Sequence, residues 1–241
     1  IFRAWDQWSG APDEDTAGWA IIDCMMNINL LYWASDETGD PRFREQAVMY
    51  ADQVMKYYIR PDGSSNHIMK FDPVTGELTG SLGGQGYADG SSWTRGQAWA
   101  MYGCASSYIH TKDERYLDTA KRTAHYFIAN IPENGLIPVD FRAPKQPYYE
   151  DSSAAAAAAS ALLELARLTA ACESEVYRRA AEKLLKALYE KRCNFSKDRD
   201  CILEKCTAAY HHKNHEFHII YGDYYFIEAI FKLRGETYQM W

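Results

Sequence analysis

The sequence predicts an all-α fold in which helical hairpins form a toroid of inner and outer helices. Seven segments show helical hydrophobic periodicity, and apolar or Ala-rich segments alternate with amphipathic ones. The apolar segments recur with acidic or hydroxyl residues at their starts, at intervals of about sixty to seventy residues, which is a loose internal repeat. A ring of buried inner helices covered by amphipathic outer helices, with loops over one rim, satisfies this alternation.

The composition fits one large domain, which we predict to cover residues 1–241. Hydrophobic residues make up 47% of the chain, enough for a sizeable core. The net charge of −7 argues against nucleic acid as a partner, and no apolar run approaches the roughly 20 residues that span a bilayer. The 7 Trp and 18 Tyr supply flat rings that carbohydrate sites use, although ordinary cores use them too.

The 6 cysteines are too irregularly spaced for a disulfide framework. Three lie in helical segments and are predicted to be small buried residues: Cys24, Cys104 and Cys172. Three lie in a later loop without the Cys-x-x-Cys pairing of common zinc sites: Cys193, Cys201 and Cys206. A reducing, cytoplasmic location is therefore predicted. Because the chain begins at Ile1 without an initiator methionine, a signal peptide further upstream stays open.

The first helix is predicted from Thr16 to Ser35 and is apolar nearly all round. Asp23 lies in the middle of this apolar run. A charged carboxylate there costs several kcal/mol unless it is paired, hydrogen-bonded or open to a water-filled cleft. Buried acids cluster at functional sites, which makes Asp23 a candidate. The structural alternative is a carboxylate that accepts hydrogen bonds from neighbouring backbone N–H groups.

A second, amphipathic helix is predicted from Asp40-Pro41 to about Tyr58. The segment 60–90 that follows is rich in Gly, Pro, Asp and Ser, with a short strand at 66–71 and a turn at 72–76. Long loops in compact domains usually serve function, and His67 lies in this one. A lone loop histidine is nevertheless more often a solvated residue.

The stretch from Gln85 to Gly103 starts as a glycine-rich loop and becomes the central helix, predicted from about 92 to 111. Its predicted cap residues are Asp89, Ser91 and Ser92. Arg95 and Trp99 lie four residues apart, on one helix face. A guanidinium beside an indole can hold a carboxylate while the ring covers an apolar sugar face. A core aromatic with a structural salt-bridge arginine is the alternative.

Four more helices complete the pattern, and one histidine-rich loop separates the last two. The helices are predicted from Asp113 to Asn130, after the cap Asp151-Ser152-Ser153, from Glu173 to Arg192 and, after the cap Asp223, from Tyr224 to Leu233. The loop carries His211, His212, His215 and His218. The spacing of His211 and His215 suits a helical metal site, but the segment has loop character and no acidic partner, so no metal is expected.

These segments resemble the unsaturated glucuronyl hydrolases of glycoside hydrolase family 88. The motifs are IIDCMMNINLLYWAS at 21–35, the His67 loop with its FDPVTGE turn, QGYADGSSWTRGQAWAMYG at 85–103, DSSAAAAAASALLEL at 151–165 and YGDYYFIEAIFKL at 221–233. The similarity covers essentially the whole chain, and the motifs follow the family order. The RGQAW sequence favours this family over the related unsaturated rhamnogalacturonyl hydrolases, which are closer to RGNGW.

The resemblance implies an (α/α)6 six-hairpin toroid. It also implies removal of a 4,5-unsaturated uronic acid from the non-reducing end of lyase-generated oligosaccharides by hydration of the double bond. The general acid/base falls on Asp23. The implied substrate contacts are His67, Gln85, Trp93, Arg95 and Trp99. No metal or organic cofactor is implied, and the expected partner is an unsaturated oligosaccharide.

Two departures from the family pattern shape the expectations. The second catalytic-site aspartate of the family is expected upstream of Ile1, together with further helices, so the chain is predicted to be the C-terminal part of a hydrolase. Uncovered apolar faces would then favour self-association. Two other functions stay open: a sister-family hydrolase of unsaturated rhamnogalacturonan, and a non-catalytic toroid fragment that binds sugar or protein. Uronate type, linkage and sulfation preference also stay open.

Overall fold

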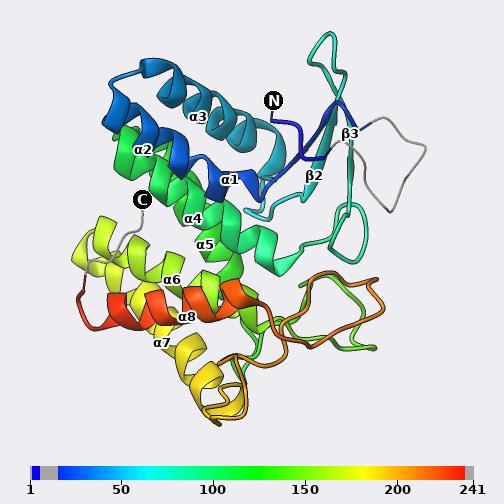
Figure 1. Ribbon diagram of the computed structural model, residues 1–241, viewed down its shortest axis with the longest axis vertical. Coiled ribbons are helices and arrows are strands. Elements are labelled where there is room, and N and C mark those ends of the chain that lie inside the picture. Colours follow the sequence, from blue (N-terminus) through cyan, green and yellow to red (C-terminus); the bar gives the residue numbers. More distant parts are fainter. Residues whose placement is uncertain (1, 6–15, 237–241) are drawn as a thin grey trace.

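The computed structural model describes residues 2–5 and 16–236, and these are mostly helical (Figure 1). The elements in chain order are β1 (Trp19–Ile21), α1 (Cys24–Asn27), α2 (Asn29–Thr38), α3 (Pro41–Gln53), the π-helical turn η1 (Val54–Tyr58), β2 (Ile68–Phe71), β3 (Leu78–Leu82), α4 (Thr94–Thr111), α5 (Glu114–Ala129), α6 (Ser152–Leu168), α7 (Ala171–Lys191) and α8 (Ile220–Leu233). Helices α2 to α8 correspond to the seven predicted segments. None of the described helices is long and apolar enough to cross a membrane.

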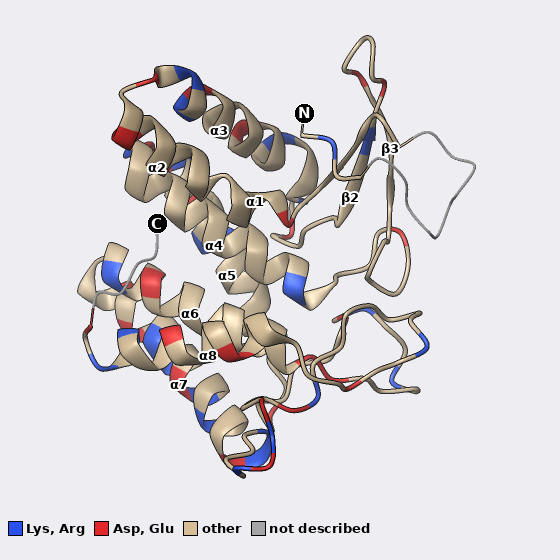
Figure 2. Cartoon of the chain, viewed as in Figure 1, with Lys and Arg blue, Asp and Glu red and all other residues tan. Residues whose placement is uncertain are grey.

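Helices α4, α6 and α8 form the inner layer. Helix α4 packs against α6 and α6 against α8, while α5 covers α4 and α7 covers α6. The six alanines of 154–159 are all 0% exposed, and such small side chains let inner helices approach closely. Charged residues lie mainly on the outer helices and loops, whereas α4 carries only one, near its start (Figure 2). The predicted alternation of inner and outer helices is therefore confirmed in this part of the chain.

The segment from 16 to 35 differs from the single helix predicted for it. Trp19–Ile21 forms β1, which pairs antiparallel with β2, and β2 pairs antiparallel with β3. A short apolar run satisfies a buried strand as well as a buried helix, so periodicity could not separate the two. Asp23 therefore lies at the N-cap of α1, directly after a strand, and not in mid-helix. The strand predicted at 66–71 is present as β2.

The predicted caps are confirmed at three helices and wrong at two. The side chains of the N-cap residues accept hydrogen bonds from the backbone N–H two residues on: Asp40 from Arg42, Asp113 from Arg115 and Asp151 from Ser153. Helix α4 instead starts at Thr94, and Asp89 bonds Ser81 and Gly90. Asp223 lies inside α8, where its carboxylate accepts from two N–H groups of the preceding loop.

The cysteines follow the prediction with one exception. All six are free, and Cys24 and Cys104 are buried as expected. Cys172 is exposed and lies in the first turn of α7, whose buried positions begin only at Tyr177. Its predicted burial was therefore wrong.

A substitution at Gly18 tests the pairing between β1 and β2, which determines the position of Asp23. A Cβ on Gly18 would stand 1.7 Å from the carbonyl oxygen of Phe71, whose N–H donates to the Gly18 oxygen at 2.9 Å. Because backbone atoms of a paired strand cannot move aside, Gly18→Ala should lower the free energy of unfolding by about 1–3 kcal/mol or more. Chemical denaturation measures this. The control is Gly80→Ala in β3, where a Cβ meets nothing within 4 Å. Equal stabilities of the two variants would contradict the prediction.

Candidate active site

The six predicted site residues meet at one rim of the helical layer, where loops lie over the starts of α1 and α4. They form a continuous set of contacts: Asp23 with His67, His67 with Gln85 and Trp93, Trp93 with Arg95, and Arg95 with Trp99 through the ring of Tyr221. The structure therefore brings together residues that are spread over the chain from position 23 to position 99.

Asp23 and His67 face one another at the end of the β1–β2 pairing. Ile21 pairs with Ile68, and the N–H of Ile22 donates to the carbonyl oxygen of His67 at 3.0 Å. This register places Nε2 of His67 3.2 Å from Oδ2 of Asp23. The Asp23 side chain is 28% exposed and that of His67 only 2%. The pair thus offers one partly accessible carboxylate supported by a buried imidazole.

The second ring nitrogen of His67 is held by the glycine-rich loop. The backbone N–H of Gln85 donates to Nδ1 at 2.9 Å. Gly84 has φ +58°, a left-handed conformation that favours glycine, and a Cβ there would stand 2.1 Å from Nδ1. The ring of Trp93 lies 4.4 Å from the imidazole, centre to centre. Both nitrogens and one face of His67 are therefore occupied by protein groups.

Arg95 is buried and fully engaged inside the protein. Its side chain is 1% exposed and forms an ion pair with Asp151, which is 0% exposed. It also donates to the carbonyl oxygens of Thr207 at 2.9 Å and Ala208 at 2.7 Å. Burial opposes the charge most strongly, but the combined attraction of Asp151 and further neighbouring groups exceeds this effect and raises the pKa of Arg95. The structural salt bridge is present, and the predicted contact with a substrate carboxylate stays a prediction.

Gln85 and Trp99 complete the predicted set. The side-chain amide of Gln85 donates to the carbonyl oxygen of Ala208 at 2.6 Å, and its side-chain oxygen has no hydrogen bond among the described residues. Trp99 is 6% exposed and packs 6.1 Å from Tyr221 and 5.2 Å from Tyr225, between ring centres. Gln85 thus retains an acceptor for a ligand hydroxyl, whereas Trp99 belongs mostly to the aromatic core.

Sequence reasoning missed Asp140, which holds the glycine-rich loop. This carboxylate is 2% exposed. It accepts hydrogen bonds from four groups: Tyr87 N at 3.0 Å, Ser91 Oγ at 2.6 Å, Ser92 N at 3.0 Å and Arg142 N at 2.8 Å. Because three of its four partners lie some fifty positions away and its own loop shows no periodicity, no local pattern marks Asp140.

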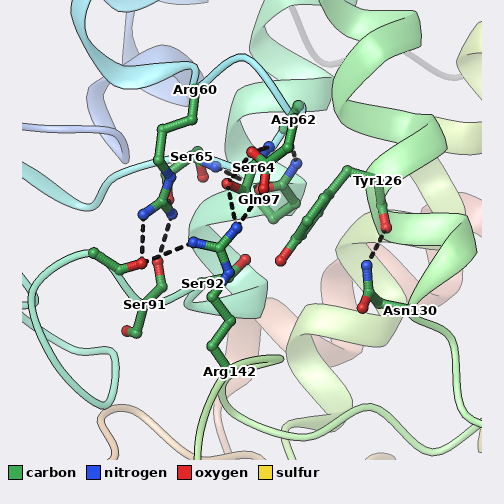
Figure 3. Close-up of polar contacts among 12 residues, drawn as sticks. Arg60, Asp62, Ser64, Ser65, Ser91, Ser92, Gln97, Tyr126, Asn130 and Arg142 are labelled. Atoms are coloured by element: carbon green, nitrogen blue, oxygen red, sulfur yellow. Dashed lines mark hydrogen bonds and ion pairs between the residues drawn. The ribbon is translucent and has the colours of Figure 1, made fainter.

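Two arginines hold the same loop from the other side (Figure 3). Arg60 donates to the carbonyl oxygens of Gly90 at 2.6 Å and of Ser91, and Arg142 donates to that of Gly90 at 2.9 Å. Burial, and then the charge of Arg142, lower the pKa of Arg60. Asp62 contacts Arg142 and partly balances the two cations. The loop that carries Gln85 is therefore fixed by charge-assisted hydrogen bonds on both sides.

The histidine-rich loop makes contacts within the protein. His215 stacks on Tyr149 with 3.7 Å between ring centres, and its Nε2 lies 2.8 Å from the carbonyl oxygen of Tyr210. His211 Nε2 lies 2.7 Å from the carbonyl oxygen of Tyr87. Across the described ranges, no group of three or more His, Cys, Asp or Glu side chains is arranged to hold a metal ion.

Comparisons with known proteins give the same family along most of the chain. The sequence pattern of Glycosyl Hydrolase Family 88 matches residues 5–232. The chain is 38% identical to an unsaturated glucuronyl hydrolase of Bacillus sp. strain GL1, over 95% of this chain and 63% of that protein. It is 33% identical to an unsaturated chondroitin disaccharide hydrolase of Streptococcus agalactiae serotype III strain NEM316, over 92% of this chain and 57% of that protein.

Solved structures agree with these relatives. The chain superposes on the crystal structure of the Bacillus sp. GL1 unsaturated glucuronyl hydrolase with a TM-score of 0.88 and 36% identity, covering 95% of this chain and 62% of that one. A second structure, a glucuronyl hydrolase variant with dGlcA-Glc-Rha-Glc, gives a TM-score of 0.90 and 36% identity, covering 98% and 63%. The fold is therefore the helical toroid of these enzymes, and the chain spans less than two thirds of their length.

Arg95 should contribute mainly to stability. Arg95→Ala leaves the Asp151 carboxylate buried without its partner, so we expect the free energy of unfolding to fall by about 3–5 kcal/mol. The matched control is Arg178→Ala, whose ion pair with Glu182 is exposed (56% and 44%) and should contribute less than about 1 kcal/mol. Thermal and chemical denaturation measure both. Unchanged stability of Arg95→Ala together with a raised KM would instead assign Arg95 to substrate binding.

Proposed function

The chain belongs to Glycosyl Hydrolase Family 88, and from this premise we propose that its protein removes 4,5-unsaturated uronic acids from the non-reducing end of lyase-generated oligosaccharides. The observation that carries the proposal is the Asp23–His67 pair, a partly accessible carboxylate supported from behind by a buried imidazole. The relatives are named for unsaturated glucuronyl and unsaturated chondroitin disaccharide substrates, which supports this substrate class.

The reaction is hydration of the double bond, with Asp23 as general acid and base. The protonated carboxyl of Asp23 gives its proton to the alkene carbon, and water adds to the other carbon of the double bond. The carboxylate then takes one proton from that water, so that one molecule of water is added and Asp23 is regenerated. The unstable product rearranges and frees the next sugar. No displacement by a second carboxylate is required.

The remaining site residues give the substrate its orientation in this proposal. The proposed contact positions are Gln85, Trp93, Arg95 and Trp99, whereas His67, which the family resemblance also implied as a contact, is proposed to act through Asp23. The free side-chain oxygen of Gln85 suits a sugar hydroxyl.

Two alternative functions can be distinguished by the substrate that the protein consumes. A sister-family hydrolase would prefer unsaturated rhamnogalacturonan fragments, and a non-catalytic toroid would bind an unsaturated sugar without consuming it.

Asp23→Asn tests the acid/base role in the full protein. The amide keeps the shape of the side chain but cannot exchange a proton, so turnover should fall by about two to four orders of magnitude. Loss of the ultraviolet absorbance of an unsaturated disaccharide measures turnover. Asp36→Asn is the matched control, because Asp36 is a 55% exposed carboxylate on α2 that pairs with Arg44. Near-wild-type turnover of Asp23→Asn would rule out the assignment.

Self-association of the chain is a second part of the proposal. Helices α2 and α8 each carry two large exposed apolar residues, as α3 and α7 also do: Leu30 (54% exposed) and Trp33 (48%) on α2, and Ile220 (78%) and Ile227 (41%) on α8. Exposed apolar surface on two helices of one ring favours association when no other helix covers it.

Light scattering on the isolated chain 1–241 tests this. We expect an apparent mass above that of one chain, with little or no hydrolase activity. The double variant Trp33→Ser and Ile227→Ser should lower the apparent mass, because it removes apolar area from both helices. Val74→Ser is the control, since Val74 is 92% exposed at the β2–β3 turn. A stable monomer, or an equal effect of the control, would contradict the proposal.

A further inference from the structure

We propose that His67 is a positioning residue for Asp23: the peptide N–H of Gln85 fixes the imidazole proton on Nε2, and Nε2–H holds Oδ2 of Asp23, so that Oδ1 is the oxygen that exchanges protons. The proposal rests on the proposed function only for the role of Asp23. The arrangement of the imidazole proton depends on geometry alone.

The Nδ1 side of His67 settles which nitrogen carries the proton. The Gln85 N–H lies 2.9 Å from Nδ1, and a peptide N–H can only donate. Nδ1 must therefore keep its lone pair, and the single proton of the neutral ring resides on Nε2. A proton on Nδ1 would place two N–H groups head to head in a site where His67 is only 4% exposed. The peptide N–H would then lack an acceptor, which costs about 1–3 kcal/mol.

The Nε2 side of His67 faces one acceptor. Nε2 lies 3.2 Å from Oδ2 of Asp23. Both atoms are buried, and neither makes a hydrogen bond to any of the described residues. The two atoms lie within donor–acceptor distance but are not aligned as a hydrogen bond, and the proposal forms this bond by rotation of the carboxyl group. His67 therefore has one polar neighbour on each nitrogen and no nitrogen left for a sugar.

The two carboxylate oxygens of Asp23 differ in solvent exposure, and we assign them different roles for this reason. The side chain is 28% exposed, yet Oδ2 has almost no accessible surface. The accessible part therefore excludes Oδ2 and leaves Oδ1 as the oxygen that meets solvent or substrate. An imidazole N–H on Oδ2 fixes the rotation of the carboxyl group. The proton-exchanging oxygen is then held in one orientation, as a positioned general acid requires.

The loop that supplies the Gln85 N–H is fixed independently of His67. Tyr210 N donates to the carbonyl oxygen of Gln85 at 2.9 Å, and Asp140 accepts from the N–H of Tyr87 at 3.0 Å. Gly84 permits the left-handed turn at φ +58° that aims the Gln85 N–H at Nδ1. The position of the donor is therefore set before any ligand binds.

Nitrogen-15 NMR of the full-length protein, labelled at histidine, tests the proton position directly at pH 7. Long-range correlations should show His67 with a protonated Nε2 and an unprotonated Nδ1. The signal of His67 is assigned by its loss in His67→Gln. A wild-type ring protonated on Nδ1, or an even mixture of the two forms, overturns the proposal whatever the activity. The expected tautomer in a protein without hydrolase activity would instead locate the failure in the proposed function.

Gly84→Ala tests whether the position of the His67 imidazole affects the rate of the reaction. Its Cβ would stand 2.1 Å from Nδ1 and displace the imidazole, so the single tautomer should be lost and kcat should fall about 10–100-fold with little change in KM. Gly80→Ala, with nothing within 4 Å of its Cβ, should change neither quantity. A raised KM with unchanged kcat would make His67 a substrate contact and overturn the proposal.

His67→Gln and His67→Ala separate positioning from folding. The glutamine amide can place an N–H near the position of Nε2, whereas alanine cannot. Glutamine should therefore retain at least about 10-fold more kcat than alanine at similar KM. Equal kcat values for two folded variants would overturn the proposal. If alanine fails to fold, the wild-type tautomer and Gly84→Ala still decide it.

Discussion

The site depends on the buried ion pair between Arg95 and Asp151. It joins the first turn of α4 to the cap of α6, and both side chains are almost without solvent exposure. Arg95 also donates to the carbonyl oxygen of Ala208, which accepts a second hydrogen bond from the amide of Gln85. Gln85 in turn holds His67, and His67 faces Asp23. Because a buried charge without its partner is strongly unfavourable, the pair fixes two inner helices and the loop that orders the site.

The inner helices carry a second polar cluster towards their other ends. Lys232 lies 3.3 Å from Glu164 and 3.5 Å from Glu228, and the hydroxyl of Tyr102 donates to Glu228 at 2.8 Å. These side chains are buried, so each charge needs its opposite and its hydrogen bonds. The cluster joins α4, α6 and α8 as the Arg95–Asp151 pair joins α4 and α6. Two separate groups of buried polar side chains therefore hold the inner helices together, and small apolar residues pack between these helices.

Local signals in the sequence were sufficient for the helices and insufficient for the loops. Asp40 and Asp113 precede amphipathic periodicity, and both are caps in the structure. The strand β1 was missed because three apolar residues satisfy either secondary structure, and the choice is made by pairing with β2, almost fifty residues later. Asp140 was missed for the same reason, since its four hydrogen-bond donors are distant or lie in irregular loops. Motif resemblance indicated which residues meet, but not that Arg95 is already paired.

Trp93 shows how stability and site geometry are combined at this rim. A Cβ on Gly96 would lie 2.6 Å from the indole and 3.2 Å from Ile22, so glycine lets Trp93 pack against α4 beside the residue that precedes Asp23. The indole then covers His67 at 4.4 Å and the Arg95 guanidinium at 4.7 Å. Its Nε1 is buried and makes no hydrogen bond to the described residues, which costs stability. The same ring contacts both the imidazole and the guanidinium, and it therefore fixes the position of one relative to the other.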